Sequence, residues 1–283
     1  MMSARRQSLQ KVPKKRMVAR ALGPIALLVN ERALFTRMVS RDISSRYKGS
    51  VFGLLWTILN PLVLLAVFGF VFGTVLKAKW GVGTKDNFSL VLFSGLSVFL
   101  LASECLNRAP MLVVQHATYV KKVVFPLPLL PPIVVGSAVV NFGVAVGLLL
   151  LVQIFLTGKV YSSWVTIPLV VAPLLIMLTG LVYLVSALGV FLRDLNQLMG
   201  LVTLVIMYMS PILFPMETVP AEFRDYLFLN PVTVPVNELR HVILAGNNPD
   251  WVAIGVYFLI SLVTLLLGYG FFLRCQRGFA DVL

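Results

Sequence analysis

Six long apolar runs, separated by short polar segments, make up most of the chain after residue 50. They lie near residues 51–76, 88–107, 133–157, 165–192, 198–214 and 251–273. An α-helix rises about 1.5 Å per residue, so about 20 apolar residues cross a hydrocarbon core of about 30 Å. The pattern therefore predicts an all-α membrane protein whose residues 49–283 form six transmembrane helices, the fifth of them short.

The segment before the first run is basic and has the periodicity of a surface helix. Asn30 is expected to cap a helix over residues 30–48. One face of this helix carries Leu34, Phe35, Met38, Val39, Ile43 and Tyr47. The other face carries Arg32, Arg37, Ser40, Arg41, Ser44 and Ser45. This pattern predicts an N-terminal amphipathic helix lying among the lipid headgroups, preceded by a basic cytoplasmic tail over residues 1–29.

The basic residues are divided unequally between the two sides of the predicted bundle. Eighteen of the 24 Lys and Arg residues fall on the side of the two termini, and six fall on the other side. By the positive-inside rule both termini are cytoplasmic. The net charge of +13 is then mainly an orientation signal and an attraction to anionic membrane lipids, and nucleic acid is not expected as a partner.

The outer segment over residues 215–250 is too long for a simple turn. It holds two apolar-rich pieces, 221–229 and 236–245, with Pro220 and Pro235 in first-turn positions. Neither piece is long enough to cross a membrane. We expect a re-entrant hairpin or a pair of surface helices between the fifth and sixth spans.

Composition and missing motifs limit the chemistry of the chain. With 59% hydrophobic and 12% charged residues, it lies outside the range of soluble domains. It has no GxxxxGK[ST] phosphate loop, no HExxH motif, no nucleophile elbow and no Cys cluster. We therefore expect that the chain is not an enzyme and has no catalytic residues, metal site or cofactor of its own.

Two polar features lie within or beside the spans. In the first span a stripe recurs every four residues, formed by Trp56, Asn60, Leu64, Phe68 and Phe72. Such a stripe can line a conduit, or it can pack against helices or lipid, and both interpretations stay open. At the end of the second span, Glu104 and Arg108 are one turn apart in the favourable order for an ion pair.

The loop after the second span combines a basic segment with a proline-rich one. Residues 115–122 predict a short basic helix on the cytoplasmic side. The four prolines within residues 126–132 preclude a regular helix there. The short helix is therefore expected to project from a stiff apolar hinge.

Four segments carry a resemblance to a known family. They are RDISSRYKGSVFGLLWTILNPL (41–62), YVKKVVFPLPLLP (119–131), FLRDLNQ (191–197) and SPILFPMETVPAEFRDYLFLNPVTVPVNELR (210–240). In order and spacing they resemble the polysaccharide-exporting class of ABC transporter permeases, which move O-antigen, teichoic acid or capsule polymers. The resemblance covers about residues 30–283. It implies a homodimer around a central conduit and two copies of a cytoplasmic ATPase subunit that binds ATP and Mg.

The resemblance also implies roles for individual residues. In that class the amphipathic helix and the short cytoplasmic helix contact the ATPase. The contacts here would be Arg37, Arg41, Asp42, Tyr119, Lys121 and Lys122. The outer hairpin gates the exit, which implies a role for Phe214, Phe223 and Tyr226. The residues that contact the polymer along the conduit would be Trp56, Asn60, Phe68, Phe72 and Tyr208.

The implied function is export of a lipid-linked polysaccharide, first of all O-antigen, across the bacterial inner membrane. An ABC permease that exports a small molecule or drug is the alternative, because a scaffold does not fix its cargo. An ion-coupled secondary transporter needs ionisable residues in mid-span, and only Glu104, near one end, approaches that position. A membrane-embedded enzyme needs acidic or His residues clustered at one membrane face, and the sequence shows no such cluster.

Overall fold

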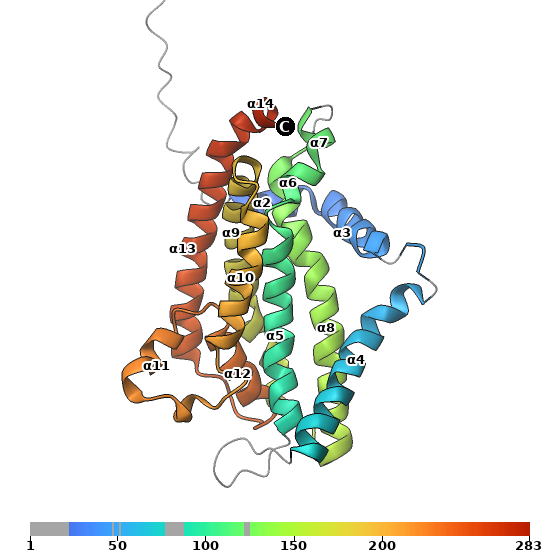
Figure 1. Cartoon of the computed structure of the whole chain (residues 1–283), viewed down its shortest axis with the longest axis vertical. Helices are drawn as coiled ribbons and strands as arrows, with labels where there is room; N and C mark the ends of the chain where they lie inside the picture. Colours follow the sequence, from blue (N-terminus) through green and yellow to red (C-terminus); the bar gives the residue numbers. More distant parts are fainter. Residues whose placement is uncertain (1–22, 47, 51, 77–87, 122–124) are drawn as a thin grey trace, which may run out of the picture.

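The computed structural model describes residues 23–46, 48–50, 52–76, 88–121 and 125–283, and the regular structure in these residues is helical. Five helical stretches among them are long and apolar enough to cross a membrane. They run over Trp56–Val75, Phe88–Arg108, Leu127–Thr157, Ser162–Phe191 and Trp251–Val282. The chain is a multi-pass membrane protein whose long helices form one bundle (Figure 1).

The long stretches contain the main helices of Figure 1. These are α4 (Trp56–Phe68), α5 (Phe88–Arg108), α8 (Leu130–Thr157), α9 (Ile167–Phe191), α13 (Trp251–Cys275) and α14 (Phe279–Val282). A π-helical segment (Gly69–Val75) continues α4, which also holds Pro61 in its interior. Both features disturb the regular hydrogen-bond ladder, and such disturbances are tolerated at membrane depth only beside protein or a polar cavity.

The fifth expected span, near 198–214, does not have the predicted length. It corresponds to α10 (Leu195–Tyr208), which has 14 residues and is about 21 Å long. The helix stops because Pro211 and Pro215 cannot continue it, and the residue before a proline disfavours helical geometry. Of the six expected spans, five therefore have full length in the described residues.

Prolines begin the third span, although the sequence suggested that they would prevent a helix. Pro131 and Pro132 occupy the first turn of α8, where a backbone N–H has no partner within the helix anyway. A short 3-10 turn (Leu127–Leu129) precedes it. The helix ends at Gly158, whose φ of +67° is the left-handed conformation that favours glycine.

The tightest packing in the bundle joins α9 to α13. A Cβ atom added to Gly180 would lie 2.6 Å from the backbone nitrogen of Leu265, and one on Gly268 would meet the carbonyl of Gly180. Small residues at such crossings let the two backbones touch, which is how helices associate without a hydrophobic driving force in lipid. The α9–α13 pair is thus held together by direct backbone contact.

A separate helix, α3 (Arg32–Arg46), lies across one end of the bundle and contacts α8 (Figure 1). A shorter helix, α2 (Gly23–Asn30), precedes it, so Asn30 ends a helix and does not cap the beginning of one. The half-buried face of α3 carries Leu34, Phe35, Met38, Val39, Asp42, Ile43 and Arg46. Its expected apolar face therefore contacts protein, together with one acid and one base.

The opposite end of the bundle holds α11 (Ala221–Leu227) and α12 (Thr233–Ile243) (Figure 1). Both apolar-rich pieces of the outer segment are thus helical. In α12 the buried Arg240 donates to the carbonyl oxygens of Val91, Pro211 and Ile212. The last two carbonyls lie just beyond the end of α10, so Arg240 satisfies groups that an unbroken helix would have satisfied itself.

Candidate functional site

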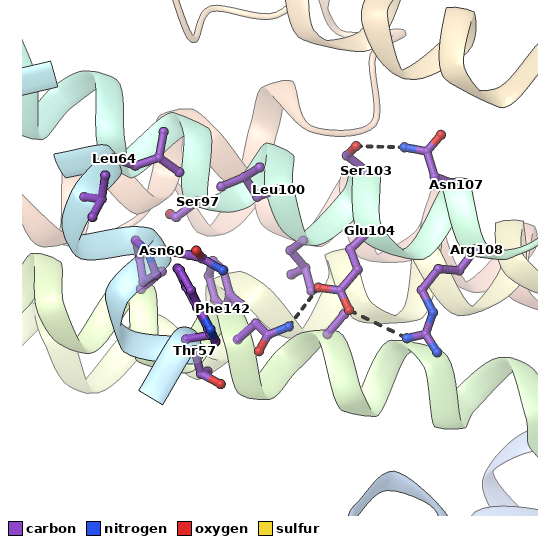
Figure 2. A pocket seen from close by; sticks show the side chains of 17 residues that line it. Thr57, Asn60, Leu64, Ser97, Leu100, Ser103, Glu104, Asn107, Arg108 and Phe142 are labelled. Carbon is purple, nitrogen blue, oxygen red and sulfur yellow. Dashed lines mark hydrogen bonds and ion pairs between the residues drawn. The ribbon is translucent and has the colours of Figure 1, made fainter. Parts of the chain in front are cut away.

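A pocket of about 670 Å³ lies between α4, α5 and α8 (Figure 2). Its walls mix apolar side chains with amides, hydroxyls and charges. The polar or aromatic lining residues are Trp56, Thr57, Asn60, Ser97, Ser103, Glu104, Asn107, Arg108, Asn141 and Phe142. Polar groups that face hydrocarbon without partners are costly, so this lining indicates a space that receives water or a polar ligand.

One lining group still has unused hydrogen-bonding capacity. The Thr57 hydroxyl is buried and has no hydrogen-bond partner among the residues that the structure describes. Asn60, one helical turn away, is exposed and also lines the pocket. Asn107, in contrast, donates to the Ser103 hydroxyl at 3.0 Å. The α4 side of the pocket therefore offers polar groups to a ligand, whereas part of the α5 side is already paired.

The end of the pocket nearest α3 is formed by a group of charged and polar residues that we call the ion-pair cluster. Three helices each supply two residues one turn apart. The members are Asp42 and Arg46 of α3, Glu104 and Arg108 of α5, and Ser137 and Asn141 of α8. The cluster thus ties the surface helix to two membrane-spanning helices.

Each arginine of the cluster contacts both carboxylates. Arg46 pairs with Asp42 at 2.9 Å and with Glu104. Arg108 pairs with Asp42 at 2.6 Å and with Glu104 at 3.7 Å, which confirms the Glu104–Arg108 pair expected from the sequence. The four charges sum to zero, and their side chains are 20–32% exposed. A neutral, closed set of pairs can be held in a place of low dielectric that isolated charges would avoid.

Two neutral side chains of α8 complete the cluster. The Ser137 hydroxyl accepts hydrogen bonds from Arg46 at 2.7 Å and from Arg108 at 3.2 Å. The Asn141 amide donates to the second carboxylate oxygen of Glu104 at 3.0 Å. Glu104 is therefore held from the side of α3 by a charge and from the side of the pocket by an amide.

The surroundings shift the pKa values of the two α3 members. Burial by itself would raise the pKa of Asp42, but hydrogen bonding to Arg108 and Ser137, with the Arg108 charge, brings this pKa below its usual value. Burial would likewise lower the pKa of Arg46, and the charge of Glu104 and the bond to Asp42 raise it above its usual value. Both shifts favour the charged forms, so Asp42 and Arg46 stay ionised at neutral pH.

The ion-pair cluster separates the pocket from a second cavity. That cavity, of about 560 Å³, lies between α3 and α6 (Leu112–Gln115). Arg108 lines both spaces, while Asp42 and Arg46 line the second cavity and not the pocket. The charged residues therefore form a partition between a space on the side of the surface helix and the pocket between the spans.

The predicted conduit residues do not all come together. Trp56 and Asn60 line the pocket. Phe68 and Phe72 are instead half-buried against the core, where Phe72 stacks on Phe88 with ring centroids 5.2 Å apart. Tyr208 is exposed at the end of α10. The structure thus splits the aromatic stripe of α4 into a pocket-lining part and a packing part.

Three of the predicted ATPase contacts share one cavity. Arg41, Asp42 and Tyr119 line a space of about 470 Å³ between α3 and α7 (Ala117–Lys121). Tyr119 also stacks on Phe125, with ring centroids 4.8 Å apart. Two further predicted contacts are exposed, Arg37 on α3 and Lys121 on α7. The last one, Lys122, lies outside the described residues.

The predicted outer-gate residues lie at the end of the bundle away from α3. Phe223 and Tyr226 are exposed on α11. Phe214 is half-buried in the segment between α10 and α11. The structure thus places all three on or beside α11, well separated in the chain from the pocket residues of α4.

Sequence reasoning missed half of the ion-pair cluster. It identified the Glu104–Arg108 pair and Asp42, but it assigned no role to Arg46, Ser137 or Asn141. A signal was present, because Ser137 and Asn141 are two polar residues one turn apart in an otherwise apolar stretch. That spacing places both side chains on one helix face. A face exposed to lipid would not carry two polar side chains.

Comparison with known proteins gives the family. Residues 33–244 match the ABC-2 type transporter family. An O-antigen export system permease protein RfbA from Klebsiella pneumoniae is 24% identical over 251 residues, covering 88% of this chain and 95% of that protein. RfbA from Myxococcus xanthus is 26% identical over 261 residues, covering 90% and 96%.

A further relative is named for a different cargo. The polysialic acid transport protein KpsM from Escherichia coli is 24% identical over 250 residues, covering 85% of this chain and 91% of that protein. The alignments extend over nearly the whole of each relative, and the family match covers α3, the pocket and α12. This chain belongs to the ABC-2 type transporter family.

Proposed function

We propose that this chain is the membrane-spanning subunit of an ATP-driven exporter of lipid-linked polysaccharide. The cargo that we expect first is O-antigen, moved from the cytoplasmic to the outer side of a bacterial inner membrane. The names of the relatives, O-antigen export permease and polysialic acid transport protein, support a glycan cargo. The family supports the role of a transport subunit whose energy comes from a separate protein.

The observation that carries the proposal is the chemistry of the pocket between α4, α5 and α8. Its amides, hydroxyls and one carboxylate match the hydroxyl groups of a sugar. The exposed Trp56 ring adds an apolar face on which a sugar ring can stack. The rest of the wall is apolar, as in most small-molecule sites, so it is the placed polar groups, and not the wall as a whole, that support a sugar as the ligand.

The topology that we propose has six crossings. In Figure 1, α3 and α14 lie at the same end of the bundle, so the chain between them crosses an even number of times. Five helical stretches are long enough to cross, and α10 with the turns that follow it would complete the sixth crossing. Both termini would then be cytoplasmic, α3 would lie in the inner headgroups, and α11 with α12 would form the re-entrant outer hairpin.

The proposed assembly contains two copies of this chain and two copies of a cytoplasmic ATPase. The ATPase subunits would bind ATP and Mg, because no phosphate loop occurs in this sequence. They would dock on α3 and α7 through Arg37, Arg41 and Tyr119, with Lys121 and Lys122 nearby. Closure of the ATPase pair would move these helices, and nucleotide can drive the spans only through a difference in binding between two states.

Within this assembly the glycan would pass from the pocket toward the outer hairpin. Trp56 and Asn60 would contact sugar units at the inner part of the path, and Tyr208 would do so further out. Phe214, Phe223 and Tyr226 would close the exit. Phe68 and Phe72 would keep α4 packed on the bundle while the polymer moves.

The test is deletion of the gene in a strain whose surface polysaccharide can be measured. The proposal expects lipid-linked polymer to collect in the cytoplasm and surface polymer to return when an intact copy is supplied. Unchanged surface polysaccharide would contradict a glycan cargo. The alternative of a small-molecule exporter would then be tested by comparing the compounds that accumulate inside the two strains.

A further inference from the structure

The ion-pair cluster joins two parts of the molecule that the proposed function treats separately. Glu104 and Asn141 form part of the wall of the pocket. Arg46 and Asp42 belong to α3, the surface helix that is proposed to meet the ATPase. Because Arg46 pairs with Glu104, an ion pair links the surface helix to the pocket wall.

The attachment of α3 depends strongly on this shared contact. No residue of α3 is fully buried, so its apolar face contributes only partial burial. The cluster supplies two carboxylate–arginine links from α3 to α5, between Arg46 and Glu104 and between Asp42 and Arg108. Charge-assisted hydrogen bonds are about twice as strong as neutral ones, so the cluster is the strongest attachment at this end of α3.

The contacts of the cluster are unequal, and the longest lies on the pocket side. Glu104 is 3.7 Å from Arg108, whereas Asp42 is 2.6 Å from the same arginine. The remaining pocket-side restraint on Glu104 is the hydrogen bond from Asn141. Glu104 and Asn141 both line the pocket, so a polar ligand there meets two groups that sugar hydroxyls bind.

We propose that the ion-pair cluster is a latch through which a ligand in the pocket controls the position of α3. A sugar hydroxyl that bonds to Glu104 or Asn141 turns the carboxylate toward the pocket and weakens its pair with Arg46. The end of α3 is then free to move relative to α8. The inference rests on the proposed function, because it takes the ligand to be the polar part of a lipid-linked glycan.

Glu104 and Asn141 are positioning residues in this scheme. They act on the ATPase side of the molecule through Arg46 and α3. The predicted consequence is a coupling between pocket occupancy and the α3–α8 contact. Such couplings between sites typically change an equilibrium by a factor of about 5 to 150.

The reporter for the latch is a pair of cysteines across the α3–α8 contact. A Cβ atom on Gly136 would lie 3.1 Å from a Val39 methyl group, so Val39→Cys with Gly136→Cys brings two thiols together. The tip of the Phe35 ring, 2.9 Å from the same position, has to turn aside. Export by the reduced double variant is therefore checked first, and the single variants serve as controls for pairing with Cys105 or Cys275.

The experiment compares disulfide yield in membranes from two strains that carry the full chain and its ATPase. One strain makes the lipid-linked glycan, and the other lacks the enzyme that starts its synthesis. We expect the ratio of uncross-linked to cross-linked protein to be at least about fivefold higher in the strain that makes the glycan. In the Glu104→Gln background the ratio should be the same in both strains.

Two further variants distinguish the latch from simple stabilisation. Asn141→Ala keeps all four charges and removes only the pocket-side hydrogen bond, so it should reduce the difference between strains without lowering the amount of protein. Glu31→Gln makes the same chemical change as Glu104→Gln outside the cluster and should preserve the difference. A merely structural role of Glu104 predicts no difference between strains in any background.

The outcomes separate the latch from the proposed function. Equal cross-linking in both strains, together with normal export by the wild-type chain, overturns the latch and leaves glycan export standing. Surface polysaccharide that is unchanged when the chain is deleted overturns glycan export and the latch together. A strain difference that persists in Glu104→Gln shows that α3 moves by another route and also overturns the latch.

Discussion

Arg46 of α3 and Glu104 of α5 are separated by 58 positions in the sequence and form an ion pair in the folded chain. Each is less than one quarter exposed. The pair therefore connects a helix on the surface of the bundle to a span that lines the pocket. A contact of this kind affects both the stability of the fold and the transmission of movement, and the two effects are separable by experiment.

Removing Arg46 alone should destabilise the protein more than removing both partners. Arg46→Met leaves Asp42 and Glu104 with one arginine between them, and the unbalanced charge is held in a poorly solvated place. Removing one partner of a fully buried pair costs about 3–5 kcal/mol, so about 2–3 kcal/mol is expected for these partly exposed groups. The measurement is the free energy of unfolding of detergent-solubilised protein.

The double variant Arg46→Met, Glu104→Met is the matched comparison. It leaves Asp42 and Arg108 as a balanced pair and should regain at least half of the lost stability. If the double variant is as unstable as the sum of the two single variants, the two residues are energetically independent. The observed ion pair would then not explain the stability of this end of the molecule.

The Asp42 carboxyl gives the protein a specific sensitivity to acid. Its pKa in the folded state lies below the usual value, so its contribution to stability is complete above the pKa of the unfolded chain, about 3.9. The contribution is lost as the pH falls through the lower folded-state pKa. The groups that contact it are Arg46, Arg108 and Ser137.

The test compares the melting temperature of the wild type with that of Asp42→Asn. The difference between the two should be constant from about pH 7 to pH 5 and should shrink below about pH 4, because protonation makes the wild-type side chain neutral as well. A difference that stays constant down to pH 3 would mean that Asp42 does not titrate with the stability of the fold.

Gly180 should tolerate no side chain, because α9 and α13 touch there. Alanine at this position would place its Cβ atom 2.6 Å from the backbone nitrogen of Leu265. Backbone cannot turn aside as a side chain can, so Gly180→Ala should cost about 1–3 kcal/mol of unfolding free energy. Gly200→Ala in α10, where a Cβ atom meets nothing within 4 Å, is the control and should be neutral or stabilising.

Much of the fold follows from local pattern, and the two exceptions have local causes. Long apolar runs dictate membrane helices, because hydrocarbon leaves backbone groups no other partners. The same rule overestimated the fifth span, since hydropathy counts Ile212 and Leu213 as apolar but does not register that Pro211 and Pro215 end the helix. The third span was instead predicted to begin too late in the sequence, because Pro131 and Pro132 are compatible with the first turn of a helix.

The candidate site depends on tertiary contacts that pattern does not contain. A spacing of four residues shows that Glu104 and Arg108 can pair within one helix. The spacing within each helix does not show that the pairs Asp42–Arg46 and Ser137–Asn141 lie at the same depth in the bundle as Glu104 and Arg108. The α4 stripe shows the same limit, because its repeat is compatible with both packing and a conduit, and only the contact between Phe72 and Phe88 shows which part packs.

Arg240 should not be replaceable by lysine. Its guanidinium donates to three carbonyl oxygens from two separate segments, Val91 on α5 and the pair Pro211 and Ile212. A lysine ammonium cannot present the same planar fork, so at least one buried carbonyl would lose its partner, at a cost of about 1–3 kcal/mol. Arg240→Lys should therefore lower the melting temperature measurably, whereas Arg274→Lys, at an exposed position in the last turn of α13 (Trp251–Cys275), serves as the control.

Replacing Asn60 with leucine tests whether its amide binds the ligand or only lines the pocket. If the pocket binds sugar, Asn60→Leu removes one neutral hydrogen bond and should reduce export about threefold to tenfold. The amount of protein in the membrane should stay constant or rise, because an exposed amide at membrane depth costs stability. Thr74→Leu, which makes a polar residue apolar on the same stretch of helix but outside the pocket, should leave export unchanged. Surface polysaccharide normalised to the amount of permease is the measurement. Equal export by the wild type and both variants would mean that polymer does not pass along this face of α4, whichever cargo the transporter carries.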